Sequence, residues 1–90
     1  MMEQSICPID VISVCAADGS IRPLRFRMEN GNDGFTRVDI SRVINCRQIQ
    51  YVGIEAYVFL CEVWMDEKRQ LLELRYTIRS HTWCLLRVVN

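Results

Sequence analysis

The chain has 90 residues and a formal net charge of zero; 50% of its residues are hydrophobic and 24% are charged. This length accommodates one domain, and the composition is globular rather than disordered. The zero net charge argues against general electrostatic attachment to nucleic acid or to an anionic membrane. We therefore expect a single domain over residues 1–90, with a frayed start at residues 1–5.

Cysteine usage and hydropathy indicate the compartment. The chain contains an odd number of cysteines, Cys7, Cys15, Cys46, Cys61 and Cys84, which disfavours a secreted disulfide scaffold. Segment 6–17 lacks a basic leader and is interrupted by Pro8 and Asp10, and no apolar run approaches the roughly 20 residues of a membrane span. We expect a cytoplasmic protein without membrane contact, whose thiols are reduced and mostly buried.

The first half of the chain predicts three strands. Residues 9–16 are apolar on both faces, and Asp18-Gly19 supplies the tight turn that follows. Residues 21–29 alternate Leu24, Phe26 and Met28 inward with Arg25, Arg27 and Glu29 outward, and Pro23 indicates a bend or bulge. After an exposed loop at 30–34, residues 35–44 form a strand that loses its alternation at 42–44, as a bulge would cause.

The second half continues the pattern. Residues 46–52 form a weaker extended segment, and the apolar run 54–64 is rich in β-branched and aromatic residues, which favours a buried strand over a helix. Residues 66–69 read as a charged hairpin loop. Residues 70–79 then alternate, with Leu71 as an outward apolar exception. A turn at Ser80-His81 leads to the last strand, residues 82–89.

Six or seven short strands without a long helix predict an all-β antiparallel meander. Closure as a small SH3-like or split β-barrel would remove the sheet edges that such a meander otherwise exposes. The expected core consists of Val11, Val14, Leu24, Phe26, Val38, Ile40, Val58, Leu60, Leu74, Tyr76 and Leu85.

Charges alternate in blocks along the chain. Residues 1–19 carry three acids and no base, 20–47 carry six arginines against three acids, 55–73 carry five acids against two bases, and 75–90 carry three arginines. In a meander such blocks lie side by side and pair across strands, at roughly 0.2–1 kcal/mol per pair. Ten arginines against one lysine also suit an interface, because the guanidinium fork binds carboxylate or phosphate and stacks on aromatics.

The sequence offers little catalytic chemistry. His81 and Cys84, with Cys61, give three candidate zinc ligands, but structural zinc sites need four ligands in closely spaced pairs. A Cys61 or Cys84 nucleophile served by His81 is disfavoured because apolar strands raise the pKa of a thiol. Glu62, between apolar neighbours, is expected to pair with an arginine across the sheet. We expect no catalytic residue and no metal.

No cofactor is expected either. The glycines of the 30–34 loop lead into a strand, whereas a phosphate-binding loop opens a helix.

The outward residues of the second and third strands form a candidate binding face, Arg22, Arg25, Arg27, Phe35 and Arg37. Small β-barrels bind single-stranded nucleic acid by stacking bases on aromatic side chains within a basic groove, for which Phe35 and Tyr51 are candidates. An acidic block of equal size offsets the arginines, so nucleic-acid binding is the alternative here, and a cysteine-dependent enzyme is a remoter one.

The favoured interpretation is a non-enzymatic module that binds another protein or itself. The first and fourth strands are apolar on both faces, and one small barrel interior does not cover both. Part of 54–64 or 82–89 is therefore expected in an interface, most simply that of a homodimer.

Three stretches carry a resemblance: Asp18-Gly-Ser-Ile-Arg-Pro-Leu-Arg-Phe-Arg27, Leu74-Arg-Tyr76 and Trp83-Cys-Leu85. With them the chain resembles an uncharacterised family of small all-β proteins from Gram-positive bacteria. The resemblance implies a bacterial cytoplasmic setting and a barrel-like fold, and it brings no activity or catalytic residue.

Overall fold

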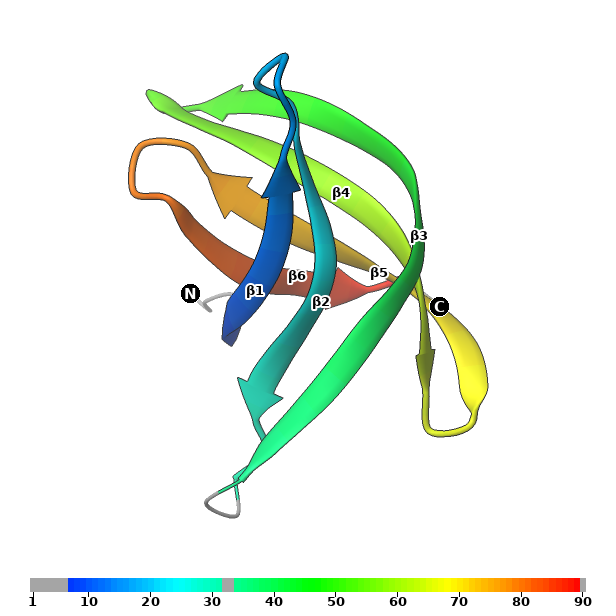
Figure 1. The fold of residues 1–90 in the computed structure, drawn as a ribbon. Helices are drawn as coiled ribbons and strands as arrows, with labels where there is room; N and C mark the ends of the chain where they lie inside the picture. Colours follow the sequence, from blue (N-terminus) through cyan, green and yellow to red (C-terminus); the bar gives the residue numbers. More distant parts are fainter. Residues whose placement is uncertain (1–6, 32–33, 90) are drawn as a thin grey trace.

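The computed structural model describes residues 7–31 and 34–89, and in these residues it contains strands and turns but no helix. The six antiparallel strands are β1 (Cys7–Cys15), β2 (Ile21–Glu29), β3 (Phe35–Tyr51), β4 (Ile54–Met65), β5 (Lys68–Thr77) and β6 (Thr82–Val88). Each strand pairs with the next, and β6 returns to β1, so the meander closes into a barrel (Figure 1). The predicted all-β fold class is confirmed, and the architecture is consistent with an SH3-like or split barrel. Residues 1–5 and part of the 30–34 loop lie outside the described residues.

Two boundaries differ most from the expectation, while ends of β1, β4, β5 and β6 differ by one or two residues. The segments 35–44 and 46–52 form one continuous strand, β3, because the irregularity between them is a pair of bulges rather than a break. Lys68 already belongs to β5, since the hairpin before it turns within two residues, Asp66 (φ 54°) and Glu67 (φ 62°). Positive φ at both central positions is the geometry of a type I′ hairpin turn, which needs no further loop residues.

The hairpin between β1 and β2 fixes the hydrogen-bonding phase of β1. The amide of Ala16 donates to the Ser20 carbonyl (2.8 Å), the amide of Gly19 donates to the Ala16 carbonyl (2.9 Å), and Gly19 has φ 91°. A glycine with positive φ after such a turn forms a bulge that keeps the two strands in register. The Asp18 carboxylate accepts bonds from the Ser20 amide and hydroxyl, which lowers the pKa of Asp18.

Bulges bend the sheet where the alternation fails in the sequence. The register between β1 and β2 passes from Ile12–Arg25 to Ser13–Pro23, which leaves Leu24 as the extra residue and confirms the expected bend at Pro23. In β3 the extra residues are Ser41 and Ile44, as expected from the lost alternation at 42–44. These bulges increase local twist and curvature. They let β3 pair with β2 through Phe35–Asp39 and with β4 through Ile40–Tyr51.

The barrel closes through a short contact. Among the described residues, three pairs join β1 to β6: Cys7–Leu85, Pro8–Cys84 and Ile9–Trp83. The longer remainder of β1 is paired with β2 alone among the described strands.

The core lies inside the barrel. It consists of Ile9, Phe26, Val38, Phe59, Cys61, Val63, Leu72 and Leu74. The expected core is confirmed at the buried residues Phe26, Val38, Val58 and Leu74, and at the partly buried Val11, Ile40, Tyr76 and Leu85, which pack against the cluster.

Three core expectations need correction. Val14 and Leu24 are each 38% exposed, because Val14 lies on the outer face of β1 and Leu24 is displaced by the bulge. Leu60 is half-buried on the outer face of β4, opposite Glu73, since its neighbours Phe59 and Cys61 occupy the inner face.

The contrast between Leu74 and Leu24 is testable. We expect Leu74→Ala to lower the free energy of unfolding by about 2–5 kcal/mol, because the leucine is fully buried and its removal leaves a cavity. Leu24→Ala is the matched control, with an expected loss of about 1 kcal/mol or less. Urea denaturation followed by circular dichroism measures both. Equal losses would contradict the assignment of Leu24 to the surface.

Candidate binding surfaces

The outer face of β1–β3 carries the predicted candidate residues. Register places Arg25 beside Asp39, Arg27 beside Arg37, and Glu29 beside Phe35. The structure therefore brings Arg25, Arg27, Phe35 and Arg37 together, and we call these four residues the arginine face. Arg22 lies beyond the bulge, opposite Val14. The side chain of Tyr51 lies outside what the structure describes.

The guanidinium groups of this face are engaged within the chain. Arg27 donates from Nε to Asp10 Oδ2 (2.9 Å), and its Cζ lies 4.1 Å from the centre of the Phe35 ring, a cation–π geometry. Arg25 Nε lies 3.7 Å from Asp39 Oδ1. The expected cross-strand pairing is thus confirmed here, while Arg37 makes no ion pair with a described residue. A surface hollow of about 450 Å³ lies between these side chains and β1.

Removal of both paired arginines distinguishes structural pairing from phosphate binding. We expect Arg25→Ala with Arg27→Ala to cost about 0–2 kcal/mol of stability, the sum of two exposed pairs, and to leave association with a single-stranded oligonucleotide negligible before and after. Equilibrium denaturation and fluorescence anisotropy at several salt concentrations measure the two effects. Micromolar, salt-sensitive binding that disappears in the double variant would instead favour a nucleic-acid function, because each neutralised phosphate adds about −0.7 to the salt slope.

Exposed apolar side chains adjoin the arginine face. Ile12 is 57% exposed, and Val14 and Leu24 are 38% exposed. They occupy neighbouring positions of β1 and β2, with Ile12 opposite Arg25 and Val14 opposite Arg22. We call these three residues the apolar patch. The alternation of β1 indicates Ile12 and Val14 as a second apolar face, and the bulge adds Leu24, which the sequence pattern assigned to the core.

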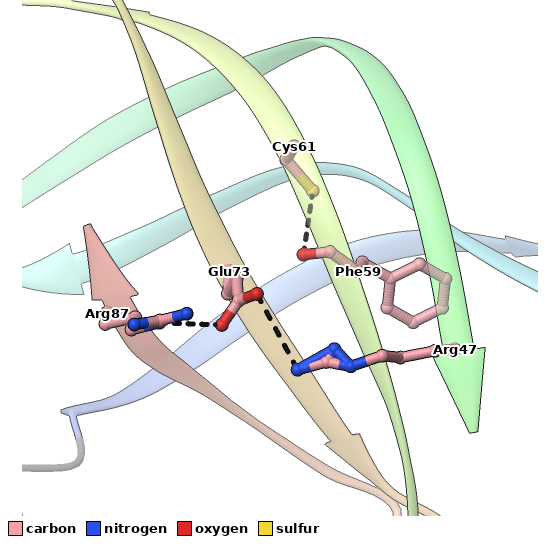
Figure 2. A network of polar contacts seen from close by, with 5 residues as sticks. All are labelled: Arg47, Phe59, Cys61, Glu73 and Arg87. Carbon is pink, nitrogen blue, oxygen red and sulfur yellow. Dashed lines mark hydrogen bonds and ion pairs between the residues drawn. The ribbon is translucent and has the colours of Figure 1, made fainter. Parts of the chain in front are cut away.

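A second charged surface covers the outside of β3–β6. Glu73 is only 8% exposed and lies between two arginines, with Arg87 Nε 2.9 Å from Oε1 and Arg47 Nη2 3.7 Å from Oε2 (Figure 2). This surface joins the acidic block 55–73 to the basic blocks on both sides of it, as the charge pattern predicts.

Glu62 repeats the same arrangement. Arg42 Nε lies 2.9 Å from Oε1 and Arg69 Nε 3.0 Å from Oε2. The expected pairing of Glu62 with an arginine across the sheet is confirmed, and a second arginine shares the carboxylate.

The cysteines and the histidine do not form one site. All five thiols are free, with Cys61 and Cys84 buried but Cys15 and Cys46 exposed, so the expectation of mostly buried thiols is wrong. Both exposed cysteines lie on strand segments with one described neighbour. Cys15 is on β1 beyond its contact with β6, and Cys46 is on the part of β3 that pairs with β4 alone.

The surroundings of Cys61 and His81 explain why they are separate. Burial, with a smaller contribution from Cys46, raises the pKa of Cys61 to about 12, and its Sγ donates to the Phe59 carbonyl (Figure 2). A protonated, buried thiol is a poor nucleophile. His81 occupies a turn, as expected, with its Nδ1 2.9 Å from the Tyr76 hydroxyl. Across residues 7–31 and 34–89, no group of three His, Cys, Asp or Glu side chains is placed to hold a metal.

Thiol labelling tests this distribution. At neutral pH we expect an alkylating reagent to modify Cys15 and Cys46 rapidly in the native protein and to spare Cys61, with all five cysteines modified after denaturation. Cys61 is fully buried, so its labelling in the native protein should require opening of its strand. Peptide mass spectrometry identifies each site. Rapid native modification of Cys61 at neutral pH would show that its strand opens readily.

Comparisons of the chain with protein-family models, with curated proteins and with solved structures find no match. Among the residues that the structure describes, no helix is long and apolar enough to cross a membrane.

Proposed function

We propose that this chain is a non-enzymatic protein-interaction module that associates with a second copy of itself through the outer face of the β1–β2 hairpin. The observation that carries the proposal is the apolar patch, because three contiguous branched aliphatic side chains on an otherwise charged face favour removal from water. Its rim holds Arg22 and Arg25, and an apolar centre with a polar rim is the usual anatomy of a protein interface. The resemblance to small Gram-positive proteins supports a bacterial cytoplasmic setting.

Other exposed apolar residues support this choice less well. Ile54 and Trp64 lie at opposite ends of β4, so they do not form one surface. Val88 and Val89 are exposed at the end of β6, where one neighbouring strand is β5. In the β1–β2 hairpin, by contrast, exposed apolar residues of two paired strands occupy neighbouring positions.

Nucleic-acid binding through the arginine face is the second candidate. Exposed Phe35 and Arg37, which makes no ion pair with a described residue, favour it, but Arg27 is engaged by Asp10 and by the Phe35 ring itself. A base that stacked on Phe35 would have to displace Arg27. A thiol enzyme has the least support, since the pKa of Cys61 is raised and no described contact joins His81 to a thiol.

Light scattering across a dilution series tests self-association. We expect a concentration-dependent dimer, and we expect Ile12→Asp with Val14→Asp to yield a folded monomer, because a charge placed in an apolar interface loses its hydration. Val52→Asp is the matched control, since Val52 is 81% exposed at the tip of a different hairpin, and it should remain dimeric. A wild-type monomer at all concentrations would overturn the proposal.

A further inference from the structure

We infer that two copies join by antiparallel pairing of their β1 strands, edge to edge, about a twofold axis at Ser13. This inference rests on the proposed function and names the contact that produces it. Addition of a strand to an exposed sheet edge is a common recognition mode, in which backbone hydrogen bonds provide affinity and side chains provide specificity.

β1 has an open edge. Its contact with β6 ends at Ile9, so Asp10–Cys15 have β2 on one side and, among the described residues, no strand on the other. The hairpin shows which backbone groups face that open side. The N–H and C=O of Ala16 both bond toward β2, and because successive residues of a strand direct these groups to opposite sides, those of Val11, Ser13 and Cys15 point away from β2.

This edge lacks the usual protection. Exposed edges in natural proteins are blunted by charges, prolines or bulges, and residues 11–17 contain no charge and no proline. Several other strand segments have one described neighbour, and the longer ones differ in this respect. Ile40–Tyr51 of β3, which pairs with β4 alone, carries Arg42, Arg47 and two bulges. In β2, residues 21–24 carry Arg22, Pro23 and the bulge, and in β3 the segment Phe35–Asp39 carries Arg37 and Asp39. The β1 edge is thus suited to pairing.

The edge is complementary to itself. With Ser13 opposite Ser13 of the second copy, Val11 lies opposite Cys15, and the three open positions of each strand meet one another in hydrogen-bonded pairs. On the outer face, Ile12 of one copy meets Val14 of the other, which extends the apolar patch across the axis. Asp10 falls opposite Ala16, so like charges do not face each other.

Ser13→Pro is the direct test, with Ser13→Ala as its matched control. Proline removes the N–H that the pairing needs, yet that N–H points away from β2, so the ladder within the chain stays intact. We expect Ser13→Pro to remain folded by circular dichroism and to raise the dimer dissociation constant about a hundredfold, since both axial hydrogen bonds are lost. Ser13→Ala keeps the N–H and should remain dimeric. A folded Ser13→Pro variant that dimerises like the wild type would overturn the inference.

Disulfide trapping gives an answer even if the proline variant does not fold. Residues opposite each other in a hydrogen-bonded antiparallel pair have Cα atoms about 5.5 Å apart, within disulfide range. In a Cys15→Ser, Cys46→Ser background, Ser13→Cys should form a cross-linked dimer under mild oxidation, and Ala17→Cys, at the exposed hairpin tip, should not. A dimer that traps at neither position, or at Ala17 instead, would reject edge pairing while leaving self-association standing. A monomer throughout would reject both.

Discussion

The contact between β1 and β6 decides what this barrel offers to its surroundings. Three residue pairs, ending at Ile9–Trp83, close the sheet, and β1 then continues to Cys15 beside β2 alone. Closure protects the backbone of a sheet, since paired strands have no open edge. Here the protection stops partway along a strand. Ile9 lies in the core on the inner face of β1, whereas Ile12 and Val14 lie on its outer face, in the part of the strand that has β2 alone beside it.

Curvature is the second requirement for this closure. A six-stranded sheet closes only if its strands bend, and the extra residues Leu24, Ser41, Ile44 and Leu86 provide bends on three different strands. The same bulges determine which apolar residues are exposed, because each shifts the inside–outside alternation by one position. Leu24 and Ile44 are exposed as a result.

The sequence predicted the all-β class, the bounds of β2, the turn residues and most of the core, because period-two alternation records which face of a strand is covered. Prediction from the sequence failed where the burial of a strand face depends on strands that are distant in the chain. β1 is apolar on both faces, and Val14 is exposed, unlike Val38, because the rest of the barrel packs against the opposite face of β1, that of Ile9 and Val11. The arginine face was found because Arg25, Arg27 and Arg37 alternate with core residues, whereas their acidic partners depended on strand register.

On the outer surface of β3–β6, the two carboxylates that are shared between arginines tolerate substitution less than the arginines do. Glu62 and Glu73 each form ion pairs with two arginines from different strands. Loss of any one of these four arginines leaves its glutamate paired with the other arginine, so each arginine can be replaced alone. Loss of a glutamate instead leaves two guanidinium groups without the anion between them, Arg42 and Arg69 around Glu62 or Arg47 and Arg87 around Glu73. Two glutamates thus position four arginines. We expect substitutions on this surface to be tolerated at the arginines and restricted at Glu62 and Glu73.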